Sequence, residues 1–201
     1  MHRTLLLALF LFLVRVNAQE RPIKIEEKKI PNRLALYAVN ENEYDLDVLI
    51  TVSGTNFRQS KARPRLIRVP ATSKVHMKTL MLMRGKQPSY TYDLVVNDSL
   101  SKRALKKEYE LIKIRPKKQI TVYVPENCKG CDSIIYPLSQ GKYIFSAYNL
   151  EEKPEMYSQL QSSLGQNFPL DSITEPIINL GGRLHTKIGT YEQLLEELNK
   201  E

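Results

Sequence analysis

The sequence predicts two domains, an all-β sandwich followed by a smaller α/β domain. The first half contains short apolar runs separated by turn-forming residues, which is typical of an antiparallel sandwich. After the charged segment RPKKQ at 115–119, strands alternate with helical stretches. Residues 19–116 carry 20 Lys and Arg against 11 Asp and Glu, a net charge of +9, whereas residues 117–201 carry 8 against 11, a net charge of −3. We therefore predict a sandwich over 32–115 and a second domain over 119–201.

Residues 1–18 are predicted to be a secretory signal peptide. Arg3 supplies a short basic region, an apolar run follows from Leu5 to Val14, and Ala18 supplies a small residue for cleavage. The alternative is an uncleaved membrane anchor, although the run is short for a bilayer span. Cleavage predicts an exported protein, periplasmic or extracellular, that touches a membrane only through the signal segment.

The sandwich is expected to contain six or seven short strands after a flexible lead-in at 19–31. His76 lies in one of these runs and is expected on the surface or at a sheet edge. The strands are predicted at 34–39, 46–53, 65–71, 74–84, 89–98 and 107–115.

The second domain is expected to follow the order β-α-β-α-β-β-α. Pro154 and Gly165 mark the two ends of its second helix, and Thr190 is the predicted N-cap of its last helix. The elements are predicted at 119–125 (strand), 132–140 (helix), 142–150 (strand), 153–165 (helix), 175–189 (hairpin) and 190–200 (helix).

Both cysteines, Cys128 and Cys131, lie in the segment VPENCKGCDSIIYPL between the first strand and first helix of this domain. Two cysteines exclude a disulfide-dense scaffold. A thiolate at a helix N-terminus, next to a cation such as Lys129, is stabilised for disulfide exchange. Cys128 is therefore the candidate nucleophile and Cys131 the candidate resolving cysteine.

Two other interpretations of the pair stay open. A structural disulfide across so small a loop would stabilise the protein by only about 2 kcal/mol. A zinc site would need two more ligands, and His76 and His185 are the remaining histidines outside the signal segment.

The element order, the CxxC after the first strand and the segment TEP at 174–176 before IINLGG resemble the thioredoxin superfamily, most closely its glutaredoxin-like branch. The resemblance covers residues 119–200. It implies a C-terminal α/β thioredoxin-like fold with Cys128 and Cys131 as the redox pair. It also implies a cis bond before Pro176, which would expose the backbone of Glu175 to an extended substrate.

These observations predict an exported thiol–disulfide oxidoreductase that acts on protein thiols or disulfides and exchanges electrons with a redox partner protein. The sandwich would serve as a docking module, joined through a hinge near 115–118 without a fixed ion pair. The alternative is a non-catalytic interaction protein that uses a thioredoxin-like scaffold. The sequence predicts no cofactor, no metal and no nucleic-acid partner.

Overall fold

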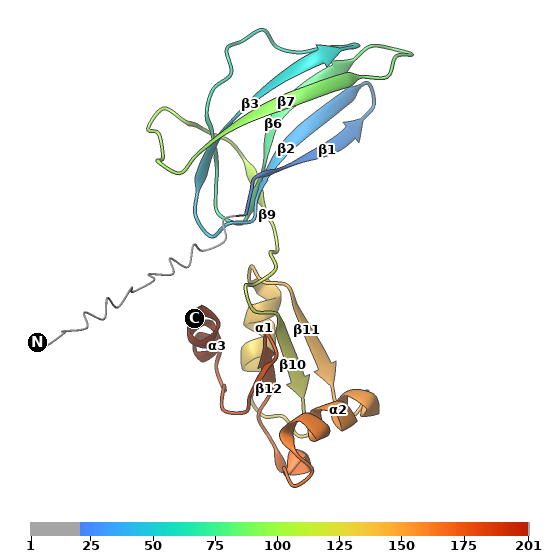
Figure 1. Ribbon diagram of the computed structural model, residues 1–201, viewed down its shortest axis with the longest axis vertical. Helices are drawn as coiled ribbons and strands as arrows, with labels where there is room; N and C mark the ends of the chain where they lie inside the picture. Colours follow the sequence, from blue (N-terminus) through green and yellow to red (C-terminus); the bar gives the residue numbers. More distant parts are fainter. Residues whose placement is uncertain (1–20, 201) are drawn as a thin grey trace, which may run out of the picture.

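The computed structural model describes residues 21–200 of the chain (Figure 1). The predicted signal peptide, residues 1–18, lies outside the described residues. Within 21–200, no helix has the length and apolar character needed to cross a bilayer.

Residues 24–111 form two sheets that pack face to face. The first has the order β1-β2-β6-β4, with β9 also pairing with β6, and the second has the order β7-β3-β5-β8. The strands are β1 (Lys24–Ile30), β2 (Arg33–Asn40), β3 (Leu46–Thr55), β4 (Phe57–Arg58), β5 (Ile67–Val69), β6 (Ser73–Leu82), β7 (Ser89–Asn97), β8 (Leu105–Lys106) and β9 (Tyr109–Leu111). Each of the six predicted strand runs contains at least part of one of these strands.

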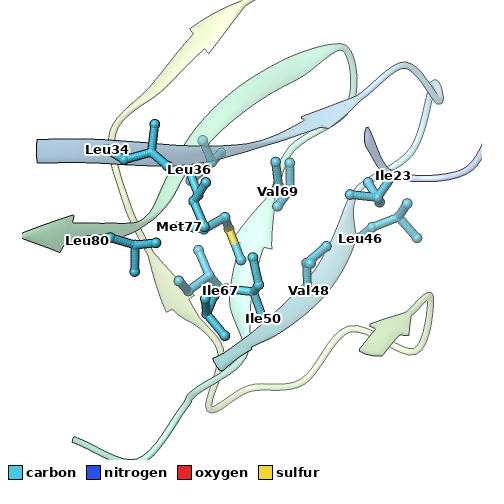
Figure 2. Close-up of a cluster of buried hydrophobic side chains, with 13 residues drawn as sticks. Ile23, Leu34, Leu36, Leu46, Val48, Ile50, Ile67, Val69, Met77 and Leu80 are labelled. Atoms are coloured by element: carbon cyan, nitrogen blue, oxygen red, sulfur yellow. The ribbon is translucent and has the colours of Figure 1, made fainter. Parts of the chain in front are cut away.

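The apolar side chains of both sheets meet in one core (Figure 2). Leu36 and Leu80 of the first sheet are fully buried, and so are Val48 and Val69 of the second. Burying a side chain of this size contributes about 1.5–3 kcal/mol, so this layer of aliphatic residues is what holds the two sheets together.

The segment predicted as a flexible lead-in forms a strand instead. Lys24–Ile30 pairs with β2 along its whole length. The prediction failed because five of its seven residues are charged and the strand lies at a sheet edge, where the charges stay exposed. The backbone pairing with β2 holds it in place, and two exposed ion pairs, Lys24–Glu41 and Lys74–Glu26, lie beside it.

A buried ion pair joins β3, β5 and the loop after β7. Asp47 is fully buried, and its carboxylate accepts hydrogen bonds from Arg68 Nε at 2.7 Å and from the backbone N–H of Ser101 at 2.5 Å. Burial disfavours the charged carboxylate, but these hydrogen bonds outweigh it and lower the pKa of Asp47 below its ordinary value. The charge is therefore stable in the core only while its donors stay in place.

The C-terminal part is built on a four-stranded sheet of order β11-β10-β12-β13. Strand β10 lies inside it, parallel to β11 and antiparallel to β12. The elements are β10 (Ile120–Val124), α1 (Asp132–Gln140), β11 (Phe145–Asn149), α2 (Pro154–Leu164), a short 3-10 turn (Leu170–Ser172), β12 (Ile177–Leu180), β13 (Arg183–His185) and α3 (Tyr191–Asn199).

Helices cover both faces of this sheet. Ile120 and Val122 pack in one cluster with side chains of α1 and α3, such as Ile134 and Leu194. Residues that alternate with them along the strands, including Ile177, pack in a second cluster with α2. The predicted N-cap of the last helix is confirmed, because Thr190 Oγ1 accepts a hydrogen bond from Gln193 N at 3.3 Å.

The predicted fold class, a sandwich followed by an α/β thioredoxin-like domain, is wrong. The described chain is mostly β, with 41% of residues in strands, 18% in helices, three sheets and three α-helices, and its C-terminal part does not resemble an α/β thioredoxin fold. Two of the three pairings in the C-terminal sheet are antiparallel, whereas the α/β class is built on parallel strands joined by helices. The turn that the sequence predicted is present, because Gly181 and Gly182, with φ of 59° and 98°, lead the chain directly back into β13.

The two parts of the chain meet beside the segment that connects them (Figure 1). Ile114 is buried in the C-terminal core, and its backbone bonds to Lys142 O and Ile144 N. On the sandwich side, the Glu43 carboxylate accepts a hydrogen bond from the Tyr143 hydroxyl at 2.5 Å and lies 3.2 Å from Lys142 Nζ. The interface is polar, and the Glu43–Lys142 pair contradicts the prediction that the two parts are joined without a fixed ion pair.

These contacts change the acidity of both junction groups. Burial and the hydrogen bond to Glu43 raise the pKa of Tyr143. Burial opposes ionisation of Glu43, but hydrogen bonds from Tyr143 and Lys142 prevail and lower its pKa. The junction is therefore charged on Glu43 and neutral on Tyr143 at neutral pH.

We expect Asp47→Ala to destabilise the sandwich by about 3 kcal/mol or more, because it leaves Arg68 without its partner. Urea unfolding at neutral pH measures this, with Asp93→Ala on the exposed strand β7 as the control. The lowered pKa means that the wild type loses this stabilisation as the pH falls below about 4, where an unfolded Asp binds a proton. The Asp47→Ala variant should lack this loss of stability at low pH. If Asp47→Ala and Asp93→Ala lowered the free energy of unfolding equally, the role given to the buried ion pair would be contradicted.

A second prediction concerns the domain boundary. A fragment that begins at residue 112 should be more stable than one that begins at 117 by about 2 kcal/mol, because it keeps the buried side chain of Ile114. Chemical unfolding of the two fragments gives the difference. Equal stabilities would mean that Ile114 is not part of the C-terminal core.

Candidate functional site

The two cysteines lie in the loop that connects β10 to α1. Cys131 takes the N-cap position of α1, which begins at Asp132, and its carbonyl accepts hydrogen bonds from the backbone N–H groups of Ile134 and Ile135. Cys128 lies three residues earlier, in the loop, where its N–H donates to Pro125 O at 3.3 Å. The expectation that Cys128 occupies the helix N-terminus is therefore wrong: the helix begins where predicted, but Cys131 takes its N-cap position and Cys128 lies in the loop before it.

Cys128 and Cys131 are joined in a disulfide, with their Cα atoms 5.8 Å apart. The two sulfur-bearing residues differ in exposure: Cys131 is buried, with 6% of its surface exposed, whereas Cys128 is partly exposed. A thiol or disulfide in solution can thus approach Cys128 more readily than Cys131. The order of attack on the pair stays a prediction.

Two distant segments hold the loop. The backbone N–H of Lys129 donates to Thr174 O at 2.7 Å. Ser133 Oγ, in the first turn of α1, donates to Gly130 O at 2.6 Å and lies 3.1 Å from Gly189 O. The CKGC loop is thus tied on one side to the segment before β12 and on the other to the segment before α3.

The structure brings Pro176 and Glu175 to this loop. A Cβ atom added to Gly130 would lie 3.9 Å from Pro176 Cδ, and one added to Gly189 would lie 3.9 Å from Glu175 Oε2. Pro176 is buried and Glu175 is exposed. The sequence therefore pointed to residues that lie together, although it did so through a family resemblance rather than through their spacing.

The predicted cis bond before Pro176 is wrong. All peptide bonds within 21–200 are trans, including the one between Glu175 and Pro176. Pro176 directly precedes β12 and is buried.

The histidines lie apart from the cysteines. His76 packs edge-on against Tyr37 in the sandwich, with ring centroids 5.4 Å apart, and burial followed by the charge of Lys107 lowers its pKa. His185 lies in β13, 4.0 Å from Glu197 of α3. Across the described part of the chain, no three His, Cys, Asp or Glu side chains are placed to hold a metal ion.

Sequence reasoning missed Ser133, Thr174 and Gly189 as contacts of the loop. Thr174 and Gly189 act through backbone carbonyl groups, which any residue supplies. The contact of Ser133 could have been predicted from the sequence, because a hydroxyl in the first turn of a helix commonly bonds to backbone groups nearby.

Comparisons of the chain with family models, curated proteins and solved structures give no match.

We expect Ser133→Ala to lower the free energy of unfolding by about 1 kcal/mol, because it removes the hydroxyl that joins the loop to Gly189. Thermal or urea unfolding of the full chain measures the change. Ser139→Ala is the matched control: its hydroxyl lies on the same helix but bonds only to nearby groups of that helix. The assignment would fail if both variants lost the same stability.

Proposed function

We propose that the protein is an exported thiol–disulfide oxidoreductase that reacts through Cys128 and Cys131. The observation that supports this most directly is the disulfide with one partly exposed and one buried partner. A substrate can reach the partly exposed Cys128, whereas the buried Cys131 is protected from direct reaction with a substrate. Reactive cysteines are found in such partly exposed positions.

The exchange would proceed in two balanced steps. In the reduced form, the Cys128 thiolate attacks a substrate disulfide, forms a mixed disulfide and releases one substrate sulfur as a thiolate. Cys131 then loses its proton and attacks the Cys128 sulfur, which releases the second substrate thiolate and forms the Cys128–Cys131 disulfide. Two electrons pass from the dithiol to the substrate, and the reverse sequence oxidises a substrate dithiol.

The loop contacts would position the reacting atoms. The Lys129–Thr174 hydrogen bond and the Ser133 contacts limit the movement of the loop when the disulfide opens. The exposed Glu175 beside the loop would contact the substrate. Lys129 carries a positive charge in the motif itself, which favours the thiolate form of its neighbour.

The distance between the sandwich and the disulfide limits which substrates the sandwich could dock. The sandwich meets the C-terminal part at Lys142 and Tyr143, after the end of α1, whereas the disulfide lies before the start of α1. Nine helical residues span about 13 Å, so a substrate held by the sandwich must extend along this helix. Docking by the sandwich would therefore suit folded protein substrates better than short peptides.

A second candidate is an interaction protein whose disulfide is structural. Cys131 is buried and caps α1, so the disulfide also fixes the loop to the start of the helix. In that case the pair would resist small thiols, and its loss would cost about 2 kcal/mol of stability.

Trapping tests the proposal. The full chain with Cys131→Ser should form mixed disulfides with exported proteins through Cys128, because the resolving step is removed. Cys128→Ser is the matched control and should trap far less, because Cys131 is buried. Non-reducing gels and mass spectrometry of the linked peptides detect the products. Absence of trapping by either variant would favour the structural disulfide, and trapping through Cys131 alone would reverse the proposed order.

A further inference from the structure

The long edge strand β7 of the sandwich is unusually apolar. Within residues 21–200 it pairs only with β3, so its other edge presents unpaired backbone groups. Tyr92, Val95 and Val96 are 43%, 57% and 45% exposed. Exposed apolar edge strands of this length are templates for pairing with another strand.

The other long edge of the sandwich is protected. Five of the seven residues of β1 are charged, which is a common way to prevent edge pairing. Strand β7 has nine residues and one charge, Asp93. It contains no Lys or Arg, although residues 19–116 carry a net charge of +9. The protein thus blocks one edge and leaves the other open.

We propose that β7 is the interface between two copies of this chain, paired antiparallel about a two-fold axis at Leu94. This goes beyond the proposed function and does not depend on it. A two-fold axis requires a surface that is complementary to itself. In this register Leu94 lies opposite Leu94, Tyr92 opposite Val96, and Asp93 opposite Val95, so no like charges face each other.

The two faces of β7 suit this pairing. Tyr90 and Leu94 pack against the sandwich core, so Tyr92 and Val96 point to the same side. Beside Leu94 and Val96 lies an open hollow of about 590 Å³ whose apolar lining includes Ile23 and Leu46. Tyr92 of the second copy would lie opposite Val96 and cover this hollow.

The side chains of β7 suit a second copy. The strand carries no Lys or Arg and one Asp, so two copies paired in this register bring no like charges directly opposite each other along it. A second β7 also brings the same alternation of core-facing apolar residues, so both cores continue under one extended sheet.

Charge variants of the full chain test the register. In the Val95→Asp variant, the new aspartate of each copy lies opposite Asp93 of the other copy, so two pairs of like charges face each other. This should weaken dimerisation by roughly two- to thirty-fold. The double variant Asp93→Lys with Val95→Asp should restore it, because opposite charges then face each other. Ile30→Asp on β1 is the control and should leave dimerisation unchanged. Sedimentation velocity over micromolar to near-millimolar concentrations gives the association constants.

A cysteine experiment tests the axis independently. In the full chain with Cys128 and Cys131 changed to Ser, Leu94→Cys should form a covalent dimer under mild oxidation, since residues directly opposite each other are within disulfide reach. Val96→Cys should not, because its equivalents lie too far apart along the strand. This background has no dithiol, so the result is independent of the proposed exchange activity.

Three results would overturn the proposal. A wild-type chain that stays monomeric at every concentration would exclude the second copy and leave a strand of another protein as the occupant. Equal weakening by Val95→Asp and Ile30→Asp would place the contact elsewhere. Linking through Val96→Cys and not Leu94→Cys would exclude the register.

Discussion

The pairing of strand β10 with both of its neighbours is the constraint on which the candidate site depends. Ile120 and Val122 are fully buried between the sheet and the helices α1 and α3, and this burial fixes the strand in the centre. The chain leaves β10 at Val124 and reaches Cys128 within four residues. Because β12 pairs with the same strand, the segment that precedes it, with Thr174 and Pro176, necessarily lies beside the CKGC loop.

The sandwich depends on an aliphatic core and on one buried charge. The Asp47 carboxylate is stable in that core only because Arg68 and Ser101 donate hydrogen bonds to it. A buried ion pair of this kind fixes the relation of β3, β5 and the loop after β7. The same sheet ends in the edge strand β7, whose one charge is Asp93, so the rigid side of the sandwich is also the side that offers a surface.

The junction between the two parts and the candidate site lie at opposite ends of α1. The junction joins Glu43, Lys142 and Tyr143 after the end of α1, while the disulfide lies at the other end of that helix (Figure 1). The connecting segment is not a free hinge, because Ile114 belongs to the C-terminal core. The edge strand β7 belongs to the sandwich, and the disulfide belongs to the C-terminal part.

The sequence by itself determined the local elements and the candidate cysteines. Apolar periodicity located the main strands and helices, and Thr190 marked the start of α3, because these signals are local. It missed β1, whose charges are stable only at a sheet edge, and it misjudged the fold class, because the direction in which strands pair depends on contacts between distant residues. Cys128 and Cys131 were found from their spacing. Their unequal burial, the trans bond before Pro176 and the contacts of Thr174 and Gly189 were decided only by tertiary structure, which brings together backbone groups that carry no signal in the sequence.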